Sequence, residues 1–369
     1  MTRSKGRALM MRTVGIPVCA LACFVTGVGA PRFVWAQEAA SAVQDVTLQD
    51  VTLPFGETIL KAARVTVSGT RLSKDELLGL LRPGTNGGPA ARLTRLDAAS
   101  ISFPELRVEY VASGVTRQVI TYREVVAKDV RAGRIAELTA AGAGIAVASG
   151  PRTGTGTYGR IQATDLDLAV LARLYGEPGD GKGAMQRVYG AFSVADVAYV
   201  DEAGAAVKLA RLEGRDLSGR QIPASWTGAL QAFTGVDLTK AAPAERARLT
   251  GVAADLAEAV SVGSLEATGL SVQETKGENP FDLGIGRMTY AGSGASLEEI
   301  GFSGGGARGK IGRLSLTGFS LGPTIATLRK LSAATADPSD DDLRRLTPAL
   351  GTMALQDLSF DLLPEPPAP

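Results

Sequence analysis

The sequence predicts a mainly β fold with short helices: an extended, mostly antiparallel twisted sheet built from repeated bulged strands, with its helices packed on one face. Three observations predict it. Glycine is abundant, at 45 of 369 residues, and aromatic residues make up only 5%, which suits thin β layers with many turns. One eight-residue pattern recurs along the chain. Short turn signals connect its copies in the manner of hairpins.

The repeated octet reads apolar, any, apolar or small, any, Asp/Gly/Ser, apolar, any, apolar. Residues 46–53, Val-Thr-Leu-Gln-Asp-Val-Thr-Leu, are its first copy. Seven further clear copies and two weaker ones follow, at residues 65–72, 96–103, 161–168, 192–199, 265–272, 314–321 and 353–360, and at 125–132 and 212–219. The copies are irregularly spaced, which disfavours a solenoid with a fixed rung length. Accidental alternation in a chain rich in Ala, Val and Leu is the alternative interpretation.

The pattern changes phase in its middle. Positions one and three alternate as on one buried face of a strand, and so do positions six and eight, but one residue out of step. A β-bulge at the fourth and fifth positions would bring both halves to the same face. Glycine suits this place because it accepts positive φ, and Asp and Ser can bond the neighbouring backbone.

Hairpins and short helices are expected between the copies. Turns at residues 112–114, 201–204 and 276–280 each separate two strand-like runs. Helices are predicted at residues 74–81, 166–175, 223–233, 244–260, 323–334 and 340–346. Ser73 and Ser339 are expected as N-caps, Glu76 completes a capping box, and Pro223 and Pro323 suit a first helical turn. Residues 83–89 and 176–183 are predicted to be loops.

The N-terminus predicts export. Arg3, Lys5, Arg7 and Arg12 precede the apolar stretch 14–28, which is shorter than the roughly 20 residues of a spanning helix. We expect a signal peptide over residues 1–36, cut after Ala36, and a periplasmic location. The remaining chain divides into β-rich repeat regions at 37–183 and 184–363 and a disordered tail at 364–369.

Export also limits the chemistry of the mature chain. Cys19 and Cys23 would leave with the signal, and the chain contains no histidine, so no disulfide can support the fold. Two alternative interpretations of the N-terminal segment remain: a lipoprotein whose lipid-anchored N-terminus is Cys23, and an uncleaved signal anchor. No spanning segment is expected after residue 36, although membrane association stays open.

No basic stripe interleaved with aromatics is visible, which argues against a nucleic-acid partner.

The first unit of the chain resembles a known family. Residues 46–53, Phe55-Gly56, the strand 63–67, and Leu72 followed by a helix with Leu77, Leu78 and Leu81 are similar to the strand-and-helix unit of AsmA-like periplasmic proteins. The resemblance is one of pattern over most of the chain, without a diagnostic motif. It implies a long twisted β-sheet with an apolar groove and a link to lipid traffic between two membranes. This chain is shorter, and its N-terminal segment looks cleavable.

Motifs that usually indicate enzymes are better explained by turns. Ser303 and Ser320 lie in serine-elbow patterns, but a hydrolase of that kind needs histidine. The glycine patterns at 154–159 and 304–309 lead into strands instead of the helix that a dinucleotide site requires. The acidic cluster 337–342 lacks the glycine and distal glutamate of a calcium loop and suits a capped helix start. The sequence therefore predicts no catalytic residue, no cofactor site and no metal site.

The predicted function is that of an exported, non-enzymatic envelope protein that binds or carries a lipid or acyl chain in an apolar groove of the sheet. The alternative is an assembly module that offers its sheet edges to another envelope protein. A carboxylate-based glycoside hydrolase is a remote alternative, because that chemistry needs no histidine. An outer-membrane barrel is more distant still, since helices such as 244–260 interrupt the strands.

Overall fold

The computed structural model describes residues 42–55, 58–81, 88–112, 115–149, 152–202, 204–233, 241–274, 280–334 and 339–362. These residues form one antiparallel sheet of 16 strands and seven short helices. The predicted signal segment 1–36, with Cys19, Cys23 and Ala36, and the predicted tail 364–369 lie outside the described residues. The predicted fold class is confirmed.

The strands are β1 (Gln44–Phe55), β2 (Thr58–Thr70), β3 (Ala98–Ala112), β4 (Val115–Arg131), β5 (Arg134–Ala140), β6 (Gly142–Ser149), β7 (Arg152–Tyr158), β8 (Ile161–Asp167), β9 (Gln186–Asp201), β10 (Ala205–Gly219), β11 (Val260–Ser261), β12 (Ser264–Glu274), β13 (Phe281–Ala291), β14 (Gly294–Gly304), β15 (Ala307–Thr317) and β16 (Thr352–Leu362). The helices are α1 (Lys74–Leu81), α2 (Pro89–Leu93), α3 (Leu168–Gly176), α4 (Trp226–Ala232), α5 (Pro243–Ala259), α6 (Gly322–Ser332) and α7 (Asp340–Arg345).

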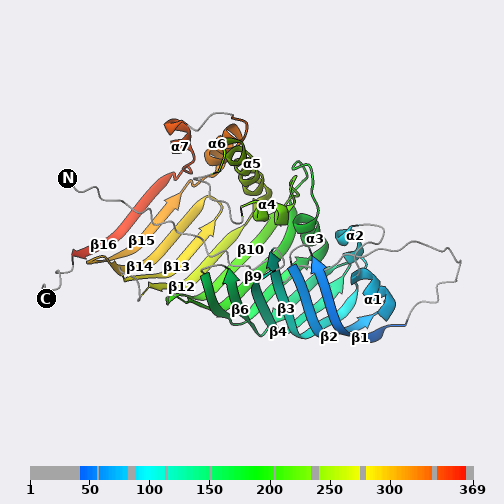
Figure 1. The fold of residues 1–369 in the computed structure, drawn as a ribbon. Helices are drawn as coiled ribbons and strands as arrows, with labels where there is room; N and C mark the ends of the chain where they lie inside the picture. The colour runs from blue at the N-terminus through cyan, green and yellow to red at the C-terminus, as the bar shows by residue number, and fades with distance from the viewer. Residues whose placement is uncertain are drawn as a thin grey trace.

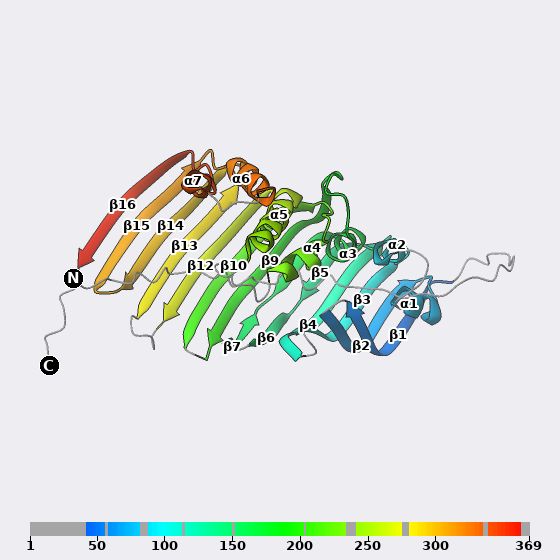
Figure 2. The same ribbon diagram turned by 45° about the horizontal axis from the view of Figure 1, so that its top comes forward.

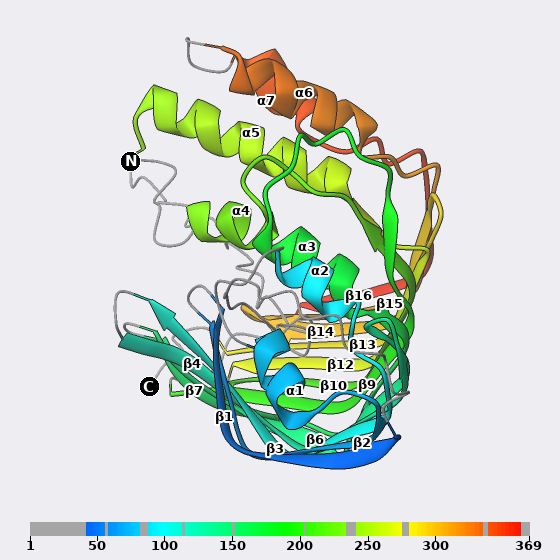
Figure 3. The same ribbon diagram turned by 90° about the vertical axis from the view of Figure 1, so that its right-hand side faces the viewer.

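The strands follow one another across the sheet almost in chain order, from β1 at one edge to β16 at the other (Figure 1). Two positions hold a pair of short strands. β4 pairs with β5 along one half and with β6 along the other, and β9 likewise pairs with β8 and β7. The sheet continues across residue 183, and the division into two repeat regions stays a prediction. Seen along its length, the sheet curves into a trough (Figure 3).

All seven helices lie along one rim of the trough (Figure 2). They occur in the connections β2–β3, β8–β9, β10–β12 and β15–β16, and these connections leave the sheet at the same end of the strands. The connections at the opposite rim carry no helix within the described residues. The trough therefore has one helical rim and one rim of hairpins.

The predicted change of face within each octet is confirmed. In the first copy, Val46, Leu48, Val51 and Leu53 are buried, and the residues between them are exposed. Nine of the ten fifth positions have positive φ, between 50° at Asp129 and 84° at Gly318; the exception is Ser100 in residues 96–103. A left-handed residue reverses the side on which the next side chains project, which explains the phase change.

The form of the phase change differs from the bulge that the sequence predicts. Gln49 pairs with Arg64 and Val51 with Ala62, so the register is the same on both sides of Asp50. A bulge would insert an extra residue into one strand and shift the register. The octets whose left-handed residue lies within a strand instead contain a kink there, opposite one residue of the next strand. We call these positions kinks below.

The predicted helices form, with local differences. Ser73 and Glu76 make the capping box of α1, and Ser339 caps α7 in the same way. α4 begins at Trp226 with Ser225 as its cap, so Pro223 is not in its first turn as predicted. The five-residue helix α2 was not predicted; it is too short to show a helical period, and a proline at its start is its main signal.

The packing divides the sheet into two parts. From β1 to β8, the concave face is covered by α1, α2 and α3, and a single apolar core fills the space between them. We call this the filled part. Among the described residues from β12 to β16, only Ala267, Ile285 and Ile300 are buried apolar residues. We call this the open part, and β9 and β10 join the two.

Candidate functional site

Four rows of apolar side chains run across the open part. Cross-strand partners in an antiparallel sheet project to the same face, so each row can be followed from the register. One row is Leu270, Ile285, Ile300, Ile311 and Leu358, and the next is Ala267, Met288, Leu297, Leu314 and Leu355. The two outer rows are Leu265, Tyr290, Ala295, Leu316 and Met353, and Val272, Leu283, Phe302, Gly309 and Phe360.

Two of these rows continue into β10 and β9. Val207 lies beside Val272 and pairs with Tyr199, and Leu212 lies beside Ala267 and pairs with Val194. These two rows therefore cross seven neighbouring strands, whereas the row of Leu265 meets Gly214 on β10. At about 4.8 Å between strands, the two rows are roughly 30 Å long.

The exposure of the rows increases toward β16. Most of their side chains on β12 to β15 are half-buried. On β16 all of them are exposed, from 47% at Leu355 to 61% at Met353, and Leu362 beyond them reaches 78%. Exposed apolar patches of this extent on a soluble surface usually mark a binding site. The main contacts of α6 are with α5 and α7, and not with these strands.

The opposite face of the open part is polar and charged. Arg287 Nε donates to Glu266 Oε1 at 2.8 Å, and Arg308 Nε donates to Asp361 Oδ2 at 3.2 Å. The hydrogen bond from Arg287 lowers the pKa of Glu266 below its usual value. One face therefore favours water and the other favours apolar material, as expected for a single-layer sheet with a ligand or partner on one side.

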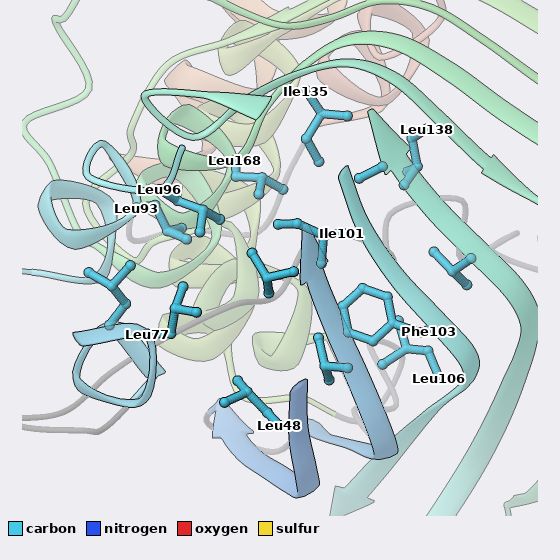
Figure 4. Close-up of a pocket in the computed structure, with 15 residues that line it drawn as sticks. Leu48, Leu77, Leu93, Leu96, Ile101, Phe103, Leu106, Ile135, Leu138 and Leu168 are labelled. Carbon is cyan, nitrogen blue, oxygen red and sulfur yellow. The ribbon is translucent and has the colours of Figure 1, made fainter. Parts of the chain in front are cut away.

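The filled part contains an apolar cavity between α1, α2 and the strands (Figure 4). Leu48, Leu77, Leu93, Phe103 and Ile135 are among its lining residues. Its volume is about 60 Å³, whereas pockets for small-molecule ligands usually measure roughly 300–1,000 Å³. The cavity is therefore too small for an acyl chain and is a packing void.

The enzyme-like motifs occupy structural positions. Ser303 lies within β14, and Ser320 Oγ accepts a hydrogen bond from the Gly322 N–H at the start of α6. The glycines from 154 to 159 lie in β7 and at its junction with β8. Gly304 ends β14, Gly305 and Gly306 form the turn, and Gly309 lies within β15. Neither glycine pattern opens a helix, so neither supplies the helix N-terminus that binds a dinucleotide phosphate.

The acidic cluster begins a helix, as predicted for its described residues. Asp342 accepts from Ser339 and from Lys330 Nζ, the latter at 2.6 Å, and these bonds lower its pKa to about 2. Asp337 lies outside the described residues. Across the part of the chain that the structure describes, no cluster of three or more acidic side chains could hold a metal ion. No helix in that same part is long and apolar enough to cross a membrane.

The sequence predicted an apolar groove but not its position. All octets look alike in sequence, and the copy on β16 was expected to bury its apolar face like the first one. Nothing local in residues 353–360 distinguishes an uncovered strand from a covered one. Only the identity of β16 as the last strand could have indicated an exposed edge.

Comparisons with known proteins find no counterpart: the chain matches no protein-family model, no curated protein and no solved structure.

Proposed function

We propose that this protein is a non-enzymatic binding protein that holds an acyl chain against the apolar rows of its open part. The observation that carries the proposal is the continuity of two of these rows across seven strands, together with the exposure of the rows on β16. The resemblance to AsmA-like proteins supports the same function, and it stays a pattern-level likeness.

The dimensions suit an acyl chain. The hydrocarbon core of a bilayer is about 30 Å thick and contains two leaflets, so one chain extends for about 15 Å. Rows of roughly 30 Å could hold one chain or two end to end. Each buried methylene contributes about 0.8 kcal/mol; eight of them would give about 6 kcal/mol, which corresponds to a dissociation constant of tens of micromolar.

The location follows from the same proposal. A protein with an open apolar trough would meet acyl chains in the cell envelope, where the predicted signal at residues 1–36 would send it. The periplasm is therefore the proposed compartment, and lipid is the proposed ligand. Neither nucleic acid nor a resident cofactor is part of the proposal.

A binding experiment with two matched variants tests it. The probe is a fluorescent sixteen-carbon fatty acid titrated into the full chain. Leu314 lies in one of the apolar rows, and Ser315 projects from the other face of the same strand. We expect Leu314→Lys to weaken binding at least tenfold and Ser315→Lys to leave it unchanged. Leu314→Gln repeats the test without a charge if the lysine variant does not fold.

The proposal also predicts lipid in the purified protein. Native mass spectrometry of the full chain, isolated from envelope extracts without detergent, should show adducts in the mass range of acyl lipids. An absence of adducts combined with no binding of the fatty acid would contradict acyl binding. Equal binding by both lysine variants would contradict the assigned site.

A further inference from the structure

With one exception, the kinks in the sheet follow one rule. The left-handed residue of one strand lies opposite a glycine or alanine of a neighbouring strand. The pairs Ile285–Ile300 and Arg287–Glu298 place Gly286 opposite Glu299, and the pairs Ile311–Leu358 and Arg313–Gln356 place Gly312 opposite Asp357. The same reasoning gives further pairs: Asp50–Ala63, Gly69–Ala99, Asp129–Ala136, Asp165–Gly190, Asp196–Ala210 and Gly269–Ala210, whereas Glu124 faces Pro104.

Steric contact explains the rule. A left-handed residue brings its Cβ atom toward the neighbouring strand. A Cβ atom added at Gly312 would lie 2.8 Å from Asp357 Cβ, and one added at Gly286 would lie 2.9 Å from Glu299 Cβ. Both distances are below normal van der Waals contact, so a larger side chain opposite the kink would push the strands apart.

The rule divides the strands into two alternating kinds. From β9 to β16, the kink residues are Asp196, Ala210, Gly269, Gly286, Glu299, Gly312 and Asp357, and every second one is left-handed. The strands with the small residue share a second feature: an arginine follows it, as in Ala210-Arg211, Gly286-Arg287 and Gly312-Arg313. The row ends at β16 with a left-handed residue that has a small partner on one side only.

β16 is also an open strand edge. Among the described residues it pairs with β15 alone, which leaves the backbone groups on its other side available to bind another strand. Its apolar side chains are the most exposed of the four rows. We propose that this edge binds an extended segment of another protein, which adds an antiparallel strand with Gly or Ala opposite Asp357. Its apolar residues would continue the rows, and an arginine would lie opposite Gln356.

A second copy of this chain does not satisfy the rule. The two edge strands β1 and β16 are of the same kind, with Gln49-Asp50 and Gln356-Asp357 at their kinks. If two β16 strands paired antiparallel with their apolar faces matched, Gln356 of the second copy would lie opposite Asp357, where Gly312 is found on the other side. The side chain of glutamine extends well beyond the Cβ atom, whereas these kinks face glycine or alanine.

The chain's own C-terminal residues do not satisfy the rule either. Residues 363–369 contain four prolines, which lack the N–H group needed for strand pairing. They also contain no apolar pattern around a glycine. We assign the edge to a strand from a different protein, bound by β-augmentation, because such a strand can supply the small residue and the arginine that the rule requires.

β15 supplies the sequence of a suitable probe. A fluorescein-labelled peptide of residues 307–317, Ala-Arg-Gly-Lys-Ile-Gly-Arg-Leu-Ser-Leu-Thr, has all the required features in the right order. The control peptide carries Val in place of Gly312 and keeps every other residue. Fluorescence anisotropy with the full chain should show binding of the first peptide, and at least tenfold weaker binding of the second.

Protein variants identify the edge that binds. Leu358→Lys places a charge in the apolar face of β16, and Ala354→Lys places the same charge on the other face, opposite Ser315. Both positions are exposed, so both variants should fold, which circular dichroism verifies. We expect Leu358→Lys to weaken peptide binding at least tenfold and Ala354→Lys to leave it unchanged. Binding that Leu358→Lys does not affect would indicate β1 instead and overturn the proposal.

Three further results would overturn it: no peptide binding at 1 mM, equal binding of the glycine and valine peptides, or a homodimer in analytical ultracentrifugation that the peptide does not dissociate. The last would make a second copy the occupant. The peptide experiment uses lipid-free protein and discriminates a single glycine, so its failure does not bear on acyl binding.

Discussion

The filled part and the open part are built from the same octet and differ in what covers it. In both, apolar residues on either side of a kink project to the concave face. In the filled part, Leu48 of the first octet is buried under α1, whereas Leu358 of the last octet is 60% exposed. The octet therefore determines where a strand is kinked and which side chains project to the concave face. The connecting helices determine whether that apolar face is buried in a core or exposed.

The largest expected effect is the difference between matched truncations in the two parts. Leu48→Ala removes a side chain that is 2% exposed and should lower the free energy of unfolding by about 2–5 kcal/mol. Leu358→Ala should lower it by less than about 1 kcal/mol, because most of the side chain is already in water. Urea denaturation of the two variants measures both values. Equal losses would contradict the division into a filled and an open part.

The second effect concerns the kinks. Asp129 lies in the filled part with φ at 50°, a conformation that a β-branched residue adopts only at a cost of about 1–2 kcal/mol. Asp129→Val should lower the unfolding free energy by about that amount. Asp129→Gly should change it by less than about 0.5 kcal/mol, since glycine accepts positive φ. If valine and glycine behaved alike in urea denaturation, the kink would not require a left-handed residue.

A smaller effect is expected from acid. Glu109 of the filled part is nearly buried and accepts hydrogen bonds from Lys61 and Arg107, which hold its pKa below the usual 4.5. A carboxylate with a lowered pKa in the folded state contributes stability above its unfolded value and loses that contribution as the pH falls through the folded value.

Thermal unfolding at several pH values measures this contribution. The melting temperature of the native chain should exceed that of Glu109→Gln between pH 6 and 7, and the difference should shrink below about pH 4.5. A difference that is constant from pH 7 to pH 3 would show that Glu109 does not act through its charge.

The smallest effect is expected in the open part. Arg308 and Asp361 form an ion pair in which both side chains are 64% exposed. Exposed pairs contribute little because water and salt screen them, so Arg308→Ala should change the unfolding free energy by less than about 0.5 kcal/mol. Denaturation at low and high salt measures this value, and a loss above 1 kcal/mol would mean that β16 depends on this pair for its position.

Much of the fold could be predicted from local pattern. The octet indicated the strands and the change of face. The alternation of apolar and polar residues on either side of a single Asp or Gly shows which side chains project to the same face. Ser73 with Glu76, and Ser339, indicated helix starts, because capping depends on a few adjacent residues. The bulge was predicted where the structure has a kink, since the two produce the same sequence pattern and differ only in the register of the neighbouring strand.

The candidate site could be predicted only in kind. Composition and the octet indicated an apolar sheet face, but the order of strands decides which copy is uncovered. The alternation of left-handed and small residues cannot be read from the sequence alone, because the two residues of a pair can be far apart along the chain. Gly312 and Asp357, for example, are separated by the whole connection through α6 and α7. Pairs of this kind become visible only once the strands are side by side.

The alternation limits how such a trough can change in length. Removing one strand would bring two left-handed residues, or two small ones, face to face. Removing a pair such as β13 and β14 would leave Gly269 of β12 opposite Gly312 of β15, and both ends to be joined lie at the same rim. Relatives of this chain should therefore be shorter or longer by an even number of strands, with a hairpin as the step.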